Sequence, residues 1–437
     1  MREEAELNRN PERVLLVGVD TGEEEDFDAA MEELKSLAEA CHMQVVGIIT
    51  QQLNNLNKAF YIGAGKVEEV RVFAGECEAE LVIFEDTLSP SQLRNLQKEL
   101  GMPVMDRTNL ILDIFATRAK SREAGLQVEA ARLKYLLPRL VGMHEALSRQ
   151  GGASGSMSSR GAGEKKLELD RRKIEHRITE LDRELKEVLK ERETQRKRRQ
   201  KSRIPQVSLA GYTNAGKSTL LNAMVEAYVG EEEKKVLEKD MLFATLETSV
   251  RRIDTGRKKP FYLADTVGFL HKLPHGLIKA FRSTLEEVKN ADLILHVVDF
   301  SDPHYKKHLE VTEETLRELG AGDIPVIYIY NKAERCMEEL PKINANRIYM
   351  SAKSGIGLEE LVGLITDTLY AKNERTAFLI PYEDGGIVSY LCEHAEVFLQ
   401  NYIERGVYLV VHCHQSDRAK FAKYIVEENE IYGRQSL

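Results

Sequence analysis

Short apolar runs alternate with amphipathic stretches at the start of the chain, and the runs are rich in β-branched residues, as buried parallel strands are. The runs are VLLVGVD (14–20), VVGIIT (45–50) and LVIFED (81–86). In the stretch SPSQLRNLQKEL, Ser89 is a candidate N-cap because Pro90 follows at the first helical position. The pattern predicts an α/β domain with a mostly parallel sheet over residues 1–119.

Residues 120–203 have a helical pattern instead. A first helical segment, roughly 120–148, leads into GGASGSMSSRGAG (151–163), whose composition predicts a flexible loop. In the segment that follows, apolar residues recur every three or four positions between charged ones, as in a coiled-coil seam. The seam residues are Leu167, Ile174, Ile178, Leu181, Leu185 and Val188. One seam needs one partner, so we predict an antiparallel helical hairpin with the Gly/Ser-rich loop at its tip.

Alternating strands and helices return over residues 204–373 and predict a doubly wound domain, in which ligands bind at the carboxyl ends of the strands. Residues 374–437 contain two apolar strands and two helical stretches, which indicate a small α+β domain. The fold class is therefore a multidomain α/β protein. His412 and His414 share one face of a strand, and Cys413 takes the other. Without further spaced ligands, ordinary strand residues are a better interpretation than a metal site.

Composition and charge indicate the surroundings in which the protein works and its partners. The chain has 437 residues, a net charge of −9 and no run of 18 apolar residues, so we expect no membrane span. Five scattered cysteines suit a reducing cytoplasm better than a disulfide framework. Basic residues concentrate in RKRRQKSR (196–203), and Arg149 and Arg160 flank the Gly/Ser-rich loop. The hairpin tip with its two arginines is a candidate RNA contact, with a plain spacer hairpin as the alternative. We expect the basic run to couple the hairpin to the domain that follows, with a solvated helix end as its alternative.

GYTNAGKS (211–218) matches G-x-x-x-x-G-K-[ST] and lies between an apparent strand and an apparent helix, which is the context the motif requires. Such a loop points its amides at phosphate oxygens and opens onto the positive end of a helix. Lys217 is placed to neutralise β/γ-phosphate charge, and Ser218 to ligate Mg²⁺. The predicted loop contacts are Gly211, Tyr212, Thr213, Asn214, Ala215, Gly216, Lys217, Ser218 and Thr219.

Three weaker motifs follow in the order found in GTP-binding switch domains. Thr245 offers a hydroxyl to Mg²⁺ and the γ-phosphate, Asp265 reaches Mg²⁺ through water, and Gly268 offers an amide to the γ-phosphate. Two further segments, 331–334 and 351–353, are placed to bind the guanine base. The residues predicted on the Mg²⁺ and γ-phosphate side are Phe243, Ala244, Thr245, Leu246 and Glu247, and Asp265, Thr266, Val267 and Gly268. Those predicted at the base are Asn331, Lys332, Ala333 and Glu334, and Ser351, Ala352 and Lys353.

Two positions depart from the usual pattern. Glu334 stands where an aspartate normally accepts from guanine, so we expect guanine preference to survive, weakened by ~1–2 kcal/mol. Phe269 stands where many switches have a water-aligning glutamine. We therefore assign catalysis to Lys217, Thr245 and Gly268, and expect slow basal turnover that a partner stimulates. Asn214 is a candidate K⁺ ligand, with shaping of the loop as the equal alternative.

With these residues assembled, the chain resembles the HflX family of ribosome-associated GTPases. The resemblance rests on stretches specific to that family, spread over most of residues 13–373. They include YIGAGKVEE (61–69), LSPSQLRNL (88–96), DRTNLILDIFATRA (106–119), LKYLLPRL (133–140), RGAGEKKLELDRR (160–172), AGYTNAGKSTLLN (210–222) and ADTVGFLHKLPHGLIKAF (264–281). It implies GTP hydrolysis with Mg²⁺, and binding to the large ribosomal subunit (50S, rRNA) near the peptidyl-transferase region.

The predicted function is a cytoplasmic, monomeric GTPase that binds the 50S subunit and splits, rescues or recycles ribosomes. One alternative is a nucleotide-dependent assembly scaffold with negligible turnover. Another is an ATP-driven RNA remodeller, because family N-terminal domains have been proposed to bind ATP and YIGAGK could hold phosphate. A structural turn is the better interpretation of that short motif.

Overall fold

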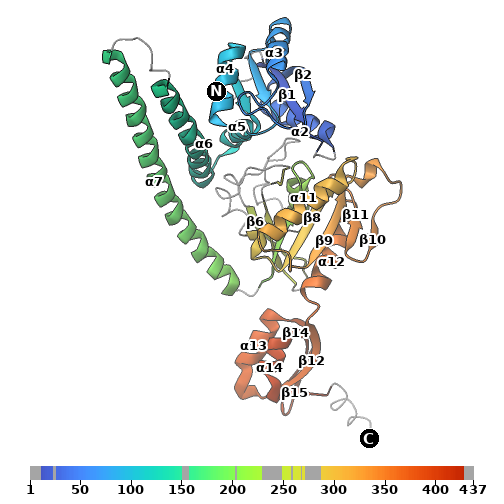
Figure 1. Cartoon of the computed structure of the whole chain (residues 1–437). Helices are drawn as coiled ribbons and strands as arrows, with labels where there is room; N and C mark the ends of the chain where they lie inside the picture. Colours follow the sequence, from blue (N-terminus) through green and yellow to red (C-terminus); the bar gives the residue numbers. More distant parts are fainter. Residues whose placement is uncertain are drawn as a thin grey trace.

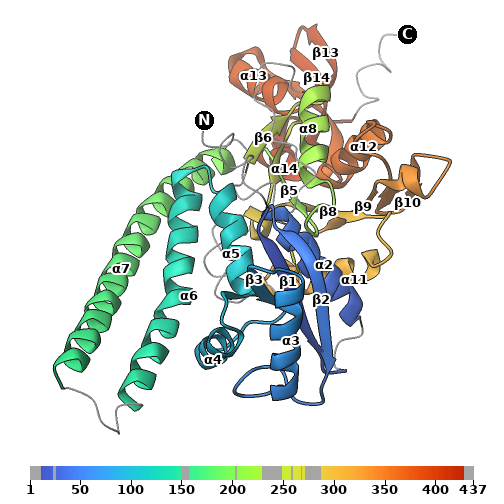
Figure 2. The ribbon, with the colours of Figure 1, turned by 90° about the horizontal axis from the view of Figure 1, so that it is seen from above.

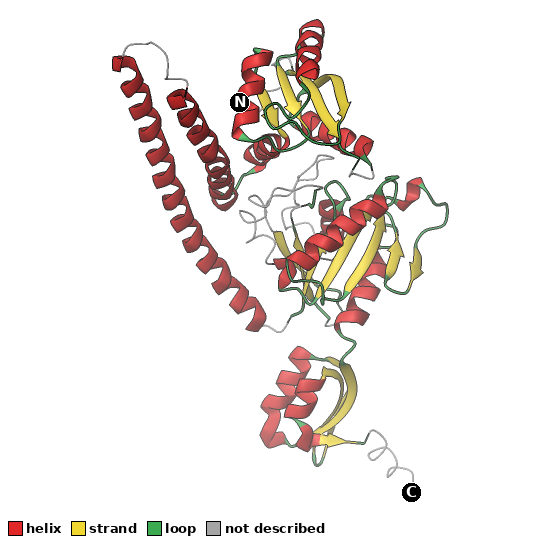
Figure 3. Ribbon diagram, in the orientation of Figure 1, coloured by secondary structure: helices red, strands yellow, loops and turns green. Residues whose placement is uncertain are grey.

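Three sheet-containing units follow one another along the chain, and a long helical hairpin lies beside the first two (Figure 1). Figure 3 shows helices on both faces of the first two sheets and on one face of the third. The structure, a computed structural model, describes residues 11–22, 26–149, 157–201, 204–228, 249–256, 259–266, 268–270 and 287–427.

The N-terminal domain is a four-stranded, all-parallel sheet in the order β2-β1-β3-β4, which confirms the predicted α/β arrangement. Its core has two halves, one against helices α2 and α5 and one against α3 and α4. Ser89 caps α4 in a capping box with Gln92, and Pro90 is the first helical residue. The elements are β1 (Arg13–Asp20), α2 (Phe27–Ala40), β2 (Gln44–Gln52), α3 (Ala64–Glu76), β3 (Leu81–Phe84), α4 (Pro90–Leu100), β4 (Val104–Asp106) and α5 (Arg107–Arg118).

Helices α6 (Arg122–Arg149) and α7 (Met157–Lys201) form the predicted hairpin and run side by side (Figure 2). Leu181 of the seam is fully buried against α6, with Leu185 and Val188 partly buried beside it. Ion pairs cross between the helices in antiparallel register, from Arg177 to Glu129 and from Arg192 to Glu123.

The loop at the hairpin tip is shorter than predicted. Helix α7 begins at Met157, so residues 157–163 are helical and the prediction of a loop across 151–163 is wrong for its second half. Helix propagation adds a hydrogen bond per residue to a helix that already exists, and this outweighs the weak propensity of single glycines. The first half of that stretch lies outside the described residues, as do the side chains of the tip arginines.

A buried carboxylate fixes the hairpin to the N-terminal domain. Asp106 caps α5 through the amide of Asn109 and is fully buried. From α6, the Tyr135 hydroxyl and an Arg139 guanidinium nitrogen donate to the same carboxylate at 2.7 and 2.9 Å. Because a buried charge without such partners is costly, these contacts set the angle at which α6 leaves the domain.

The second domain is a seven-stranded sheet in the order β10-β11-β9-β8-β5-β7-β6, parallel except for its two edge strands. Helices α8 and α12 cover one face, and α11 lies against the other. This is the doubly wound domain predicted over 204–373. The elements are β5 (Gln206–Ala210), α8 (Lys217–Tyr228), β6 (Ser249–Ile253), β7 (Phe261–Asp265), β8 (Leu293–Asp299), α11 (Tyr305–Glu318), β9 (Val326–Asn331), η2 (Ala333–Arg335), β10 (Lys342–Asn344), β11 (Arg347–Tyr349) and α12 (Leu358–Leu369).

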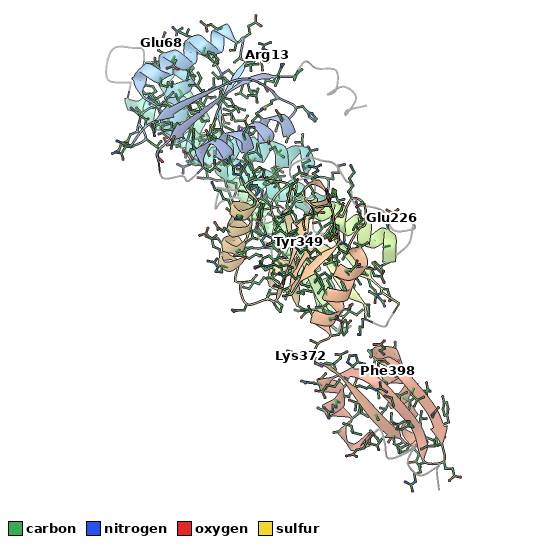
Figure 4. The ribbon with its side chains drawn as sticks, turned by 90° about the vertical axis from the view of Figure 1, so that its right-hand side faces the viewer. Arg13, Glu68, Glu226, Tyr349, Lys372 and Phe398 are labelled. Atoms are coloured by element: carbon green, nitrogen blue, oxygen red, sulfur yellow. The ribbon has the colours of Figure 1, made fainter. Side chains whose placement is uncertain are left out.

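The C-terminal domain is a small antiparallel α+β unit, as predicted, with strand order β13-β14-β12-β15. It joins the second domain near Lys372 (Figure 4). Cys413 is buried in its core, and His414 caps a helix by accepting from the Ser416 amide, so both have structural roles. The elements are β12 (Asn373–Ile380), η3 (Tyr382–Asp384), α13 (Gly385–His394), β13 (Glu396–Ile403), β14 (Gly406–His414), α14 (Gln415–Lys420), η4 (Ala422–Tyr424) and β15 (Ile425–Val426).

The described part of the chain shows neither a cluster of metal-binding side chains nor a membrane-spanning helix. Its histidines, cysteines and carboxylates form no group of three or more that could hold a metal ion. None of its helices combines the length and the apolar character needed to cross a bilayer.

Candidate nucleotide site

The predicted site residues that the structure describes meet at the carboxyl ends of strands in the second domain. The loop 211–216 connects β5 to α8, Asp265 ends β7, and Asn331 ends β9. These strands lie close together in the sheet, so three segments far apart in sequence converge on one edge.

The loop 211–216 has the geometry of a phosphate cradle. Lys217, the first residue of α8, is buried and donates to the carbonyls of Gly211 and Tyr212 at 3.0 and 2.7 Å. Burial lowers the pKa of the Lys217 ammonium to about 8, although the carboxylate of Asp265 opposes this shift. A phosphate at the start of α8 would restore the charged form, since an anion stabilises an adjacent ammonium.

The two side chains predicted to serve Mg²⁺ lie together. The Ser218 hydroxyl donates to the Asp265 carboxylate at 2.8 Å, and Asp265 is fully buried. A hydroxyl and a carboxylate are hard oxygen ligands of the kind Mg²⁺ takes beside substrate phosphates, so the pair fits that ion. Thr266, next in sequence, donates to the Leu209 carbonyl at 2.6 Å and ties β7 to β5. Its role is therefore in positioning the strand.

Asn331 joins the loop 211–216 to the segments that are predicted to bind the base. Its side-chain amide donates to the Ala215 carbonyl at 2.9 Å, and its side-chain oxygen accepts from the Ala352 amide at 2.9 Å. Lys332 then donates to the Asn214 carbonyl at 2.9 Å and to the Asp299 carboxylate at 2.7 Å. One buried amide thereby links β5, β9 and the segment after β11.

The remaining base-site residues are placed around this joint. Ala333 and Ser351 are buried, while Glu334 and Lys353 are exposed, where a base could reach them. The exposure of Glu334 in the short helix η2 leaves its longer side chain room to adjust, which is consistent with the expected survival of guanine preference. Binding of the base by these residues stays a prediction.

The side chain of Phe269 is buried in a core and does not enter the predicted nucleotide site. Its side chain is 2% exposed and packs in the second domain's core with Val288, Ile294 and Leu316. Its backbone pairs with the loop 211–216, since the Thr213 amide donates to the Phe269 carbonyl at 2.9 Å. The residue after Gly268 is therefore an apolar anchor for this segment, and a side chain in that pocket cannot align a water molecule.

Gly268 approaches the phosphate loop closely. A Cβ there would lie 2.9 Å from the Cα of Thr213 and 3.1 Å from the Lys217 ammonium. Glycine is thus required for the backbone to come within reach of that lysine. Phe243, Ala244, Thr245, Leu246, Glu247 and Val267 lie outside the described residues, so their predicted contacts remain predictions.

Two residues of the site were missed in the sequence. Asp299 forms an ion pair with Lys332. Although burial raises the pKa of the Asp299 carboxyl, hydrogen bonds from Lys332 and Ser301 keep that pKa below its usual value. Burial and the charge of Lys217 lower the pKa of His296 to about 3, so this buried imidazole under the phosphate loop stays neutral. In the sequence, the available signal for Asp299 as a site residue was its position at the end of an apolar strand.

Replacing Gly216 with alanine tests the Asn331 joint. The backbone of Gly216 has φ +92°, and a Cβ there would lie 2.2 Å from the Asn331 side-chain nitrogen. We expect Gly216→Ala to weaken GDP binding roughly 100-fold, about 2–3 kcal/mol, from backbone strain and a displaced amide. Titration with a fluorescent GDP analogue measures this.

Gly363→Ala is the matched control, because Gly363 lies within α12 and a Cβ there meets no atom within 4 Å. Its GDP affinity should equal that of the wild type. Wild-type affinity in Gly216→Ala would contradict the assigned role of Asn331.

The chain is similar to known proteins over most of its length. Three family models match in succession: the N-terminal region of GTP-binding GTPases over residues 28–116, their middle region over 118–199, and a 50S ribosome-binding GTPase domain over 206–332. The border between the first two matched regions lies at the end of α5, and the second ends near the end of α7, whereas the first begins in α2, after β1.

Curated relatives match over most of the chain. The chain is 46% identical to GTPase HflX of Caldanaerobacter subterraneus, covering 92% of this chain and 91% of the relative. It is 38% identical to GTPase HflX of Escherichia coli, covering 86% of this chain and 88% of the relative. A GTP-binding protein of Sulfolobus solfataricus, solved with GDP, is similar at 24% identity and a TM-score of 0.43, covering 82% of this chain and 99% of that one. By the extent and identity of the matches to the two HflX relatives, the chain belongs to the HflX family of GTPases.

Proposed function

We propose that this protein is a GTP-driven switch that binds the large ribosomal subunit, with slow intrinsic hydrolysis that the subunit accelerates. The match of residues 206–332 to a 50S ribosome-binding GTPase domain supports the partner. The observation that carries the slow intrinsic rate is the buried side chain of Phe269, which leaves the usual position of a water-aligning group without one.

The site residues have separable roles in this proposal. The Lys217 ammonium and the amides at the start of α8 hold the β- and γ-phosphates, and the Gly268 amide contacts the γ-phosphate. Ser218 and Asp265 would hold Mg²⁺, which neutralises phosphate charge when bound. Asn331 and Lys332 hold the loops that receive the base. Splitting, rescue or recycling of ribosomes is the cellular outcome we propose for this cycle.

The N-terminal domain acts as a structural and docking unit in this proposal. In the YIGAGK segment, the Gly63 amide donates to the Gln51 side chain at 2.9 Å, and Lys66 pairs with Glu69 at 2.7 Å. Groups that a phosphate would need are already engaged, which favours the structural-turn interpretation over an ATP-driven remodeller.

Turnover with and without ribosomal subunits tests the partner. We expect addition of isolated 50S subunits to raise kcat for GTP at least about 10-fold, because the missing water-aligning or charge-stabilising group then comes from the complex. Phosphate release measures this, with 30S subunits as the control. Turnover unaffected by 50S subunits would favour the alternative of an assembly scaffold.

Monovalent cations test a second contribution to catalysis. We propose that Asn214, exposed within the phosphate loop with φ +60°, helps to hold K⁺ beside the phosphates. Basal turnover should then be roughly 10-fold or more higher in potassium than in sodium chloride, as expected for an added transition-state charge.

Asn214→Gly removes the side chain without straining this backbone, so it should abolish the difference between the two salts. Rubidium, close to potassium in size, should substitute for it in the wild type. Equal wild-type rates in potassium and sodium would leave Asn214 with a loop-shaping role only.

A further inference from the structure

The core of the N-terminal domain extends into the nucleotide site. The apolar cluster between its sheet and helices α2 and α5 includes two buried residues of the second domain, Tyr212 and Leu270, with Val311 of α11 packed against it. Tyr212 belongs to the phosphate loop, and Leu270 is the second residue after Gly268. The two segments proposed to contact the phosphates are therefore held in the core of another domain.

Polar contacts reinforce this packing. The Tyr212 hydroxyl donates to one carboxylate oxygen of Glu33 in α2, and Arg107 of α5 donates to the other. The Tyr212 ring also stacks on His308 of α11, with ring centres 3.9 Å apart. We call these contacts and the packing of Leu270 the latch.

The latch contains a buried charge network within the N-terminal domain. Arg107 is 2% exposed, and a second carboxylate, that of Glu85, lies 4.0 Å from its guanidinium. Although burial opposes the charged form, the carboxylates of Glu33 and Glu85 hold the pKa of Arg107 above its usual value. Glu33 is thus held beside Arg107 and oriented toward Tyr212.

The backbone links the latch to the phosphate contacts. The Phe269 amide donates to the Gly211 carbonyl at 3.1 Å, and the Thr213 amide donates to the Phe269 carbonyl at 2.9 Å. Leu270 directly follows this paired residue, and Gly268 directly precedes it. Because Leu270 is only two residues from Gly268, a movement of Gly268 toward a γ-phosphate must displace Leu270 as well.

The interface beside the latch is poorly suited to hold the domains together alone. A cavity of about 680 Å³ lies between α2 and the phosphate loop. Carboxylates from both domains line it, including Asp28 and Glu32 on one side and Asp299 and Asp302 on the other. Like charges across a partly desolvated gap repel, and His304 lies 2.8 Å from the Asp26 carboxylate across the same gap, so docking depends on the latch together with that contact.

We propose that the latch makes docking of the N-terminal domain depend on the bound nucleotide. With GDP, Leu270 and Tyr212 stay in the N-terminal core and the latch is closed. With GTP, the contact between Gly268 and the γ-phosphate draws Leu270 out, and the latch loosens. Glu33 and Arg107 are then positioning residues for the nucleotide site, acting through Tyr212. This inference requires nucleotide binding but no ribosome.

Amide hydrogen exchange of the full-length protein tests the proposal. We expect peptides of α2 and α5 to exchange at least about 5-fold faster with a non-hydrolysable GTP analogue than with GDP, the lower end of typical coupling between sites. Peptides from β14 and α14, in the C-terminal domain, should not respond. Protection of residues 211–228 by either nucleotide verifies that the site is occupied.

Glu33→Gln keeps the size of the side chain but removes the charge that holds Arg107. It should accelerate exchange of α2 with GDP and shift the ratio of GTP-analogue to GDP affinity about 5-fold toward the analogue, because coupling between sites is reciprocal. Glu39→Gln is the matched control, since Glu39 is exposed on the same helix and is not among the residues that line the cavity. Its exchange and affinity ratio should match the wild type.

Tyr212→Phe decides the question if Glu33→Gln does not fold. It removes only the hydroxyl bonded to Glu33, keeps the ring on His308, and should shift the affinity ratio in the same direction. Equal exchange of α2 and α5 with both nucleotides in the wild type would overturn the proposal, as would an unchanged affinity ratio in a folded Glu33→Gln variant. Loss of protection at 211–228 would instead count against nucleotide binding itself.

Discussion

The site depends on one buried side-chain amide. Asn331 donates to the loop 211–216 and accepts from the segment after β11, so it fixes the loops predicted to bind the phosphates and the base relative to each other. A buried amide that lost either partner would incur a desolvation cost, which restricts these loops to one arrangement. Gly216 must lack a side chain because Asn331 occupies that space. Lys332 and Asp299 extend the same joint toward the loop carbonyl at Asn214.

The second constraint is the way the segment after Asp265 is anchored. Phe269 packs in the second domain and Leu270 in the N-terminal domain, so adjacent residues are anchored in two different cores. This arrangement explains why the position after Gly268 can be apolar in a GTPase: its side chain holds the backbone in place. Water alignment must then come from elsewhere, and the segment is placed to respond to its neighbours as well as to the nucleotide.

Local patterns in the sequence were enough to predict most of the fold. The parallel N-terminal sheet, the cap at Ser89, the hairpin seam around Leu181 and the strand ends at Asp265 and Asn331 each follow from short-range signals that tertiary structure does not override. The start of α7 was misjudged because glycine and serine weaken a helix without preventing its extension from an existing one.

Contacts between domains were beyond such reasoning. The pairing of Tyr212 with Glu33 joins residues 179 positions apart, and nothing in the residues around Glu33 distinguishes it from the solvated acidic face of α2. Asp299 was missed for a similar reason, since its partner Lys332 is 33 positions away. Such long-range polar pairs become visible only once the sheet order is known.

The central claim is that these loops form a guanine-nucleotide site despite the glutamate at position 334. Calorimetric titration of the full-length protein with GTP and ATP analogues in the presence of Mg²⁺ tests it most directly. The account predicts GTP-analogue binding tighter by roughly 10²–10³-fold, because buried groups that pair with guanine are left unpaired by adenine. Equal affinities for the two nucleotides would contradict it.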